Sequence, residues 1–265
     1  MNRPDPPPES PRPAPLADTR ALPDPTLSAL PASLSGPAIG GEPASWHVPR
    51  IHPEGWRFAA IPAGVALVAA LVGSGPLFWI GLVLTLMVAM FFRDPERVTP
   101  AGEDLLVAPA DGLVIQILEA ELPRQLVGED GLPPGRALRI SIFLSVFDVH
   151  INRAPLAGTV RRQVYVPGLF LNADLDKASE DNERSYLVIE GLDGTRVGVT
   201  QIAGLIARRI LSFVRPGVMV AAGQRFGLIR FGSRTDLWLP AGWEPAVLKG
   251  QRVVGGETIM ARKRA

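Results

Sequence analysis

The feature that most constrains this chain is an uncharged stretch that runs from Phe58 to Phe92. The sequence Gly73-Ser74-Gly75-Pro76 divides it near the middle, and such a cluster strongly favours a turn. Each half then holds about 15–16 residues, slightly fewer than the ~20 that an upright transmembrane helix needs. We therefore predict an apolar helical hairpin that either enters one leaflet or crosses a thinned bilayer. A soluble, buried pair of helices is the alternative.

Basic residues flank the apolar stretch on both sides. Arg50 and Arg57 precede it, and Arg93 and Arg97 follow it. Because positively charged flanks tend to stay on the cytoplasmic side, both ends of the hairpin are predicted to lie there. The expected location of the protein is thus the cytoplasmic face of the cell membrane.

The stretch before the hairpin, residues 1–55, is dense in Pro, Ser, Ala and Gly and has no sustained apolar period. Such a composition buries too little apolar surface to offset the entropy lost on ordering, so we predict a disordered tail. Prolines between Pro4 and Pro15 also interrupt any signal-peptide core. The predicted domains are this tail, the membrane-associated hairpin at 56–93 and a folded domain at 94–265.

From Asp94 onward, short runs of Val, Ile and Leu are bounded by Gly, Pro and Asp, a pattern typical of strands. The predicted strands are Leu105–Val107, Leu113–Leu118, Leu138–Leu144, Thr159–Val166, Ser185–Ile189, Arg196–Ile202 and Phe226–Phe231. The polar segment Leu169–Glu183 is predicted to be a long functional loop. We therefore expect a mainly β (α+β) fold, with a compact β-rich domain after the hairpin.

Composition excludes several kinds of chemistry. The 27 Lys and Arg residues nearly balance the 26 Asp and Glu residues, which disfavours a nucleic-acid partner. The chain has no Cys, so it has no disulfide, thiolate metal site or Cys nucleophile. Its three histidines, His47, His52 and His150, show no helical ligand spacing, and we predict no metal site.

Several short polar blocks follow one another in a fixed order. They are Phe91-Phe92-Arg93-Asp94-Pro95, Ala108-Pro109-Ala110-Asp111-Gly112, Phe147-Asp148-Val149-His150-Ile151-Asn152-Arg153, Asn172-Ala173 with Asp176-Lys177 and Asn182-Glu183-Arg184, Gln201-Ile202-Ala203-Gly204, and Phe231-Gly232-Ser233-Arg234. As an ordered set over roughly residues 91–240, they closely resemble the short-form phosphatidylserine decarboxylases of the pyruvoyl-dependent decarboxylase family.

The resemblance implies a proenzyme that cuts itself between Gly232 and Ser233. Ser233 Oγ would attack the Gly232 carbonyl, which no Cβ shields, and elimination and hydrolysis would leave a pyruvoyl group in place of Ser233. This cofactor would form a Schiff base with phosphatidylserine in the membrane and accept the electron pair released with CO2, giving phosphatidylethanolamine. The large and small chains would remain associated as a heterodimer, and a homo-oligomer of that unit stays open.

The resemblance also points to residues that assist the reaction. Asp111 and His150 are candidates for the base, with the aspartate holding the imidazole tautomer. In the long form of the family a second histidine follows, and Arg153 stands at that position here. Asp148 is therefore an alternative partner for His150. Further candidates, for substrate binding, are Arg153, Lys177 and Arg184.

Three alternatives remain at this level. Taken alone, Asp111-Gly112 is a good hairpin turn, and His150 is a satisfied core histidine. A pyruvoyl-dependent decarboxylase of a soluble amino acid would keep the chemistry and change the substrate. A non-enzymatic lipoyl- or biotinyl-like β domain on a membrane anchor would need a lysine in its motif, and Lys177, Lys249 and Lys263 all lie elsewhere.

Overall fold

The computed structural model describes residues 49–168, 182–204, 209–230 and 233–264, all within one compact unit, 48–265. Most of the predicted tail and nearly all of the predicted polar loop, together with Lys177 and Gly232, lie outside the described residues.

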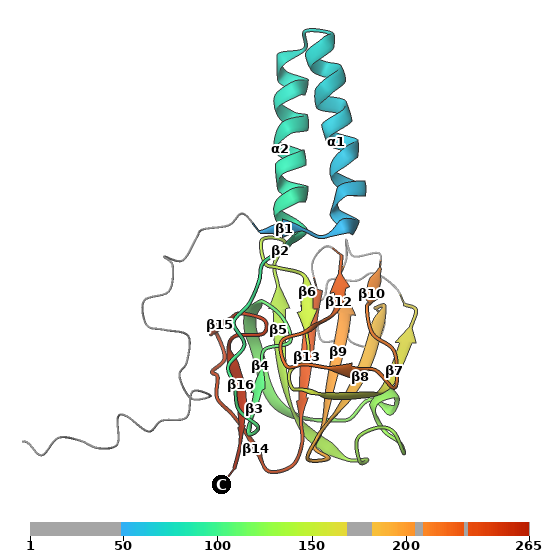
Figure 1. Cartoon of the computed structure of the whole chain (residues 1–265), viewed down its shortest axis with the longest axis vertical. Helices are drawn as coiled ribbons and strands as arrows, with labels where there is room; N and C mark the ends of the chain where they lie inside the picture. Colours follow the sequence, from blue (N-terminus) through green and yellow to red (C-terminus); the bar gives the residue numbers. More distant parts are fainter. Residues whose placement is uncertain (1–48, 169–181, 205–208, 231–232, 265) are drawn as a thin grey trace, which may run out of the picture. The chain divides into compact units, whose positions relative to one another are not determined.

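The predicted helical hairpin is present as α1 (Pro53–Leu71) and α2 (Gly75–Phe91), which lie side by side (Figure 1). Helix α1 starts before the uncharged stretch because the His52 side chain caps it, accepting a hydrogen bond from the Glu54 N–H at 3.3 Å. The helices approach closely at Gly81, where an added Cβ would lie 2.9 Å from the Ala66 backbone nitrogen. Small residues thus set the packing of the hairpin.

Large apolar side chains on both helices are exposed. They include Trp56, Ile61, Leu67, Val68, Leu71, Val72, Trp79, Ile80, Val83, Leu86 and Met87. Among the described residues, α1 alone is long and apolar enough to cross a membrane, and α2 is apolar but shorter. In contrast to the alternative of a buried helical pair, these outward side chains are not covered by the described part of the chain.

The remainder of the described chain is mainly β, as predicted. Its strands are β1 Arg50–Ile51, β2 Arg93–Asp94, β3 Leu105–Val107, β4 Gly112–Glu121, β5 Arg136–Leu144, β6 Ile151–Arg153, β7 Gly158–Val166, β8 Arg184–Gly191, β9 Arg196–Ala203, β10 Ile210–Ser212, β11 Met219–Val220, β12 Arg225–Ile229, β13 Ser233–Leu239, β14 Trp243–Pro245, β15 Arg252–Val253 and β16 Ile259–Lys263, with a 3-10 turn, η2, at Arg124–Leu126. Each predicted strand has a counterpart, although Phe231 lies outside the described residues.

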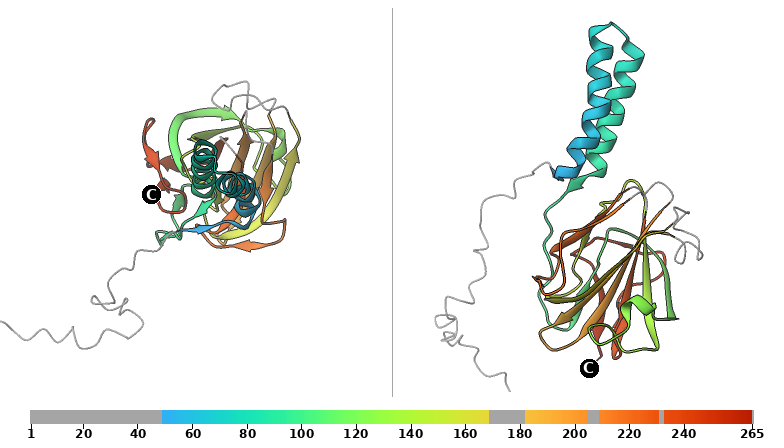
Figure 2. Two further views of the ribbon diagram at one scale, coloured as in Figure 1. Left: turned by 90° about the horizontal axis from the view of Figure 1, so that it is seen from above. Right: turned by 90° about the vertical axis from the view of Figure 1, so that its right-hand side faces the viewer.

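The largest sheet is antiparallel, with strand order β11-β7-β8-β9-β13-β5-β4-β15, and Figure 2 shows its curvature. Two three-stranded sheets, β10-β12-β6 and β14-β16-β3, accompany it. The main apolar core gathers buried residues of several of these strands, including Leu106, Ile140, Val160, Leu237 and Met260. Strand β12 lies beside β6 in one sheet, and β13, which follows it in the chain, enters the centre of the large sheet.

Strand β13 was absent from the sequence prediction. Its charged residues Arg234 and Asp236 interrupt the apolar pattern that indicates a strand. In the structure both are buried and bond each other twice, Nε to Oδ1 and Nη2 to Oδ2, at 2.9 Å each. This pairing offsets the cost of burying the two charges, which no single-residue pattern reveals.

Candidate active site

Ser233 is the first residue of β13, opposite Ala203 of β9 and Leu144 of β5. It is fully buried, and among the described residues its Oγ has no hydrogen-bond partner. A buried hydroxyl left unpaired costs about 1–3 kcal/mol, so proteins seldom retain one without a reason. The structure therefore places such a hydroxyl at the predicted nucleophile, and Ser141 of β5 carries a second one.

A buried polar network lies on the same face of β13 as Ser233, because alternate residues of a strand share a face. Asn152 Nδ2 donates to Thr235 Oγ1 at 3.2 Å, and Gln201 Nε2 donates to Asn152 Oδ1 at 2.7 Å. These bonds join β6, β9 and β13 next to Ser233. The sequence analysis assigned no role to Asn152, Gln201 or Thr235, although the first two lie in the polar blocks.

His150 directly precedes β6 and is fully buried. Its Nδ1 lies 2.9 Å from the backbone carbonyl oxygen of Asp148. Because a carbonyl oxygen only accepts, Nδ1 carries the proton and Nε2 carries the lone pair. Burial lowers the pKa of His150 to about 4, against the raising effect of Asp148. At neutral pH this side chain is thus a neutral imidazole whose Nε2 is unprotonated.

The turn before His150 is held by the Asp148 carboxylate. It accepts hydrogen bonds from Ser145 N–H at 2.8 Å and Ser145 Oγ at 2.7 Å, and it also pairs with Arg252. The carboxylate therefore shapes the turn, while the backbone carbonyl of the same residue contacts the imidazole. This division of roles was not visible in the sequence.

Asp111 immediately precedes β4, and its two carboxylate oxygens have separate partners. Oδ2 accepts from Arg97 Nη2 and Oδ1 from the Gly255 N–H, both at 2.7 Å. Burial raises the pKa of Asp111, and Arg97 and the Gly255 N–H oppose this. The next residue must be glycine, because at Gly112 φ is 151° and a Cβ would lie 2.2 Å from the Phe143 carbonyl oxygen. A direct Asp111–His150 pair stays a prediction.

The predicted substrate-binding residues are in different surroundings. Arg153 is buried and donates to the carbonyls of Gly223 at 3.0 Å and Pro95 at 2.7 Å, and to Asp94 at 3.4 Å. These three bonds hold the Arg153 guanidinium within the protein. Arg184 opens β8 and is half-buried, opposite Ile202 of β9.

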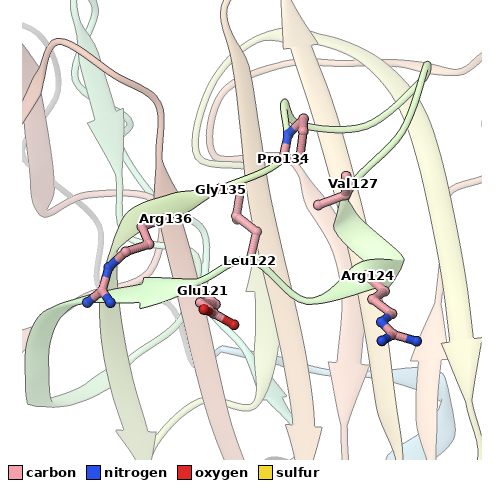
Figure 3. Close-up of a pocket in the computed structure, with 7 residues that line it drawn as sticks. All are labelled: Glu121, Leu122, Arg124, Val127, Pro134, Gly135 and Arg136. Carbon is pink, nitrogen blue, oxygen red and sulfur yellow. The ribbon is translucent and has the colours of Figure 1, made fainter.

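Three cavities lie away from Ser233, His150 and Asp111, none of which is in their linings. One of about 410 Å³, around the end of β4 and η2, is drawn in Figure 3, and another of about 980 Å³ adjoins it. The third, of about 340 Å³, is lined by Gln163, Tyr165, Ser185, Arg209, Ile210, Leu211 and Ser212. Within the described part of the chain, no group of three His, Asp or Glu side chains is arranged to hold a metal.

The chain is similar to known proteins of one family. The phosphatidylserine decarboxylase family profile matches residues 84–261. A phosphatidylserine decarboxylase proenzyme of Novosphingobium aromaticivorans is 56% identical over 223 residues, covering 82% of this chain and 88% of that protein. Those of Erythrobacter litoralis and Zymomonas mobilis are 55% and 51% identical, covering 83% and 82% of this chain and 90% and 88% of those proteins.

The family match spans the candidate site from Asp111 to Ser233, and the three relatives are similar to this chain over most of its length. The chain belongs to the phosphatidylserine decarboxylase family.

Proposed function

We propose that this chain is the proenzyme of a phosphatidylserine decarboxylase that cleaves itself between Gly232 and Ser233 and converts Ser233 into a pyruvoyl group. The observation that carries the proposal is the fully buried Ser233 hydroxyl, which has no hydrogen-bond partner among the described residues. A hydroxyl that no described residue engages is able to turn toward a neighbouring carbonyl without first giving up a hydrogen bond to one of them. The relatives' description as proenzymes supports the same reading.

Self-cleavage proceeds by nucleophilic attack, elimination and hydrolysis. Ser233 Oγ bonds to the Gly232 carbonyl carbon, the peptide C–N bond breaks, and the hydroxyl proton passes to the released amine. A base then removes the Cα proton of the resulting serine ester, and the Cβ–O bond breaks to free the Gly232 carboxylate. The dehydroalanine that remains takes up one water and loses ammonia. The products are a new C-terminus at Gly232 and a pyruvoyl group at position 233.

His150 is the base that this site supports best. Its Nδ1–H is directed to the Asp148 carbonyl, so Nε2 bears the lone pair, and its pKa of about 4 keeps the ring neutral at pH 7. An unprotonated Nε2 is available to accept a proton, and the lowered pKa favours giving that proton back afterwards. We assign His150 to proton transfer in self-cleavage and in decarboxylation, and Asp111, through Arg97 and Gly255, to holding the start of β4 beside the site.

The pyruvoyl ketone supplies an electron sink for the pair of electrons released as CO2 leaves the substrate. No metal is needed for that chemistry. Arg184, at the start of β8, and Lys177 are proposed to bind the substrate head group.

The two chains produced by cleavage would stay together. Strand β13, which begins the small chain, pairs with β9 on one side and β5 on the other, and both belong to the large chain. The membrane partner is supported by the exposed apolar side chains of α1 and α2, a surface that favours lipid over water. We place the β domain on the cytoplasmic face because Arg50, Arg57, Arg93 and Arg97 flank the hairpin.

Intact-mass spectrometry of the purified protein, with CO2 release from phosphatidylserine in detergent micelles, tests this function. The wild type should give two chains, residues 1–232 and 233–265, the second starting with a pyruvoyl group. Ser233→Ala should remain one chain and be inactive, because alanine has neither nucleophile nor leaving group.

Ser141→Ala is a matched control, because Ser141 is also fully buried, lies in the same sheet and has an Oγ without a partner among the described residues. It should cleave normally. An active wild-type enzyme that remains a single chain would refute the proposal. Activity on free serine equal to that on the lipid would favour the soluble-substrate alternative.

A further inference from the structure

The apolar hairpin is bonded to the residues that immediately precede the proposed cleavage point. Arg230 follows β12 and stands two positions before Gly232 in the sequence. Its Nη2 pairs with the Glu54 carboxylate in the first turn of α1, and its guanidinium carbon lies 5.1 Å from the centre of the Phe58 ring, one turn further along. Two separate contacts from α1 therefore hold one side chain.

This contact differs from an ordinary surface ion pair. The Arg230 and Glu54 side chains are 18% and 24% exposed, so water screens their attraction less than at an open surface. Glu54 has a second cation nearby, Arg57, but at 3.9 Å and with an 82% exposed side chain. The pair with Arg230 is thus the closer and the better shielded of the two.

The same end of the hairpin also contacts the candidate base. Phe58 stacks on Phe92 with ring centres 5.4 Å apart, and Phe92 contacts Phe91 at 5.0 Å. Phe91 in turn lies 4.2 Å from the His150 ring centre. A continuous row of rings therefore connects Arg230 to His150.

We propose that Glu54 and Phe58 are positioning residues for self-cleavage, acting through Arg230 to hold the chain that leads to the Gly232 carbonyl. The inference rests on the proposed cleavage at Gly232–Ser233. Strand β13 fixes Ser233 from one side of that bond, and β12 ends at Ile229, before it. The Arg230 anchor thus holds the last described residue before that bond, as β13 holds the first residue after it.

Loss of the Arg230–Glu54 contact should therefore slow self-cleavage. Misplacement of a reacting group by about 1 Å is able to cost on the order of 100-fold in rate. We expect Glu54→Ala and Arg230→Ala each to slow self-cleavage by about 10- to 100-fold. Phe58→Leu keeps an apolar side chain but removes both the cation–π contact with Arg230 and the ring stacking on Phe92, and it should slow cleavage by about 2- to 5-fold.

The experiment follows cleavage of the full-length chain, newly synthesised in the presence of detergent micelles, by the rate at which the 233–265 fragment appears. Because Glu54 and Arg230 act through one bond, the double variant Glu54→Ala/Arg230→Ala should cleave as slowly as the slower single variant. Multiplied effects in the double variant, or single variants that cleave at the wild-type rate, would overturn the inference. A wild-type chain that never cleaves would instead refute the proposed function.

Arg225→Ala is the matched control. Arg225 lies at the other end of β12 and also pairs with a residue near the hairpin, Asp94, at 2.7 Å. Its removal should leave the cleavage rate within about twofold, since surface ion pairs contribute little. Equal slowing by Arg225→Ala would mean that general loosening of β12 explains the effect, and the inference would fail.

Hydroxylamine identifies the step that the anchor assists. It cleaves an accumulated serine ester to a Gly232 hydroxamate, whereas it leaves an intact peptide bond uncut. If the anchor aligns the carbonyl for attack, the uncleaved Glu54→Ala chain should be resistant to hydroxylamine. A hydroxylamine-sensitive chain would show that the ester forms normally, which contradicts a role in alignment.

Discussion

The hairpin and the β domain distribute apolar and charged groups in opposite ways. Along the hairpin, large apolar side chains such as Leu67 and Trp79 are exposed. In the β domain, charged groups such as Arg234, Asp236 and Arg153 are buried. Each distribution is costly in water unless it has a compensating partner, which is lipid for the first and an opposite charge or a carbonyl for the second. The contrast shows that a single hydrophobic-inside rule does not describe this chain.

The two regions meet in a small apolar cluster at the base of the hairpin. It contains Phe91, Phe92, Val149, Ile151 and Leu228, with Ile51, Phe58, Val88 and Leu211 packed against it. Gly55 permits this contact, because a Cβ there would lie 2.5 Å from the Cβ of Phe92. The cluster buries His150 and explains why a histidine next to a candidate active site is kept neutral.

The largest effect is expected when charged side chains are placed on the exposed apolar surface of the hairpin. Val68 and Ile80 are exposed on α1 and α2, and replacing both by Asp places two unpaired charges on the apolar surface. Each should disfavour insertion by about 2.5–3.5 kcal/mol. Vesicle flotation should show the Val68→Asp/Ile80→Asp variant mostly unbound, whereas Val98→Asp, at an exposed position outside the hairpin, should float like the wild type. Equal flotation of both variants would exclude lipid as the partner of this surface.

A smaller effect is expected where the β domain loses a charge partner. Asp236→Ala leaves Arg234 buried without its bidentate partner and should lower the free energy of unfolding by about 3–5 kcal/mol. Denaturant unfolding in detergent, on a Ser233→Ala background that keeps one chain, measures this. Lys263→Ala removes the exposed pair with Asp193 and should cost under about 1 kcal/mol. If the two variants lose equal stability, burial is not what makes the first pair important.

The third effect concerns His150, where the two regions meet. Its pKa is about 4 in the folded protein and about 6.5 in an unfolded chain, so between these values only the unfolded chain takes up the proton. Stability should therefore fall as pH drops from about 6.5 to 4, by on the order of 3 kcal/mol. His150→Gln on the Ser233→Ala background should lack this part of the pH dependence. An unchanged profile in the variant would show that other groups account for it.

Much of the fold follows from local patterns. The hairpin, its turn at Gly73 and the strands with an apolar pattern such as β5, β7 and β9 were predicted, because periodicity and turn residues act over a few positions. Short edge strands such as β11 and β15 were missed, since two residues carry too little pattern. Strand β13 was missed because its charges signal exposure until their pairing is known.

For the candidate site, the sequence by itself determined only which residues are candidates. Its ordered motifs resemble the phosphatidylserine decarboxylases, and that resemblance named Ser233, His150 and Asp111. Only the tertiary structure decided the partners of two of them, which are a backbone carbonyl for His150 and Arg97 with the Gly255 N–H for Asp111. It also decided that Arg230 pairs with Glu54. The physical reason is the separation in sequence between the residues that interact. A strand or a turn is set by neighbours in the chain, whereas Glu54 and Arg230 are brought together only when β12 and α1 pack on the same apolar cluster.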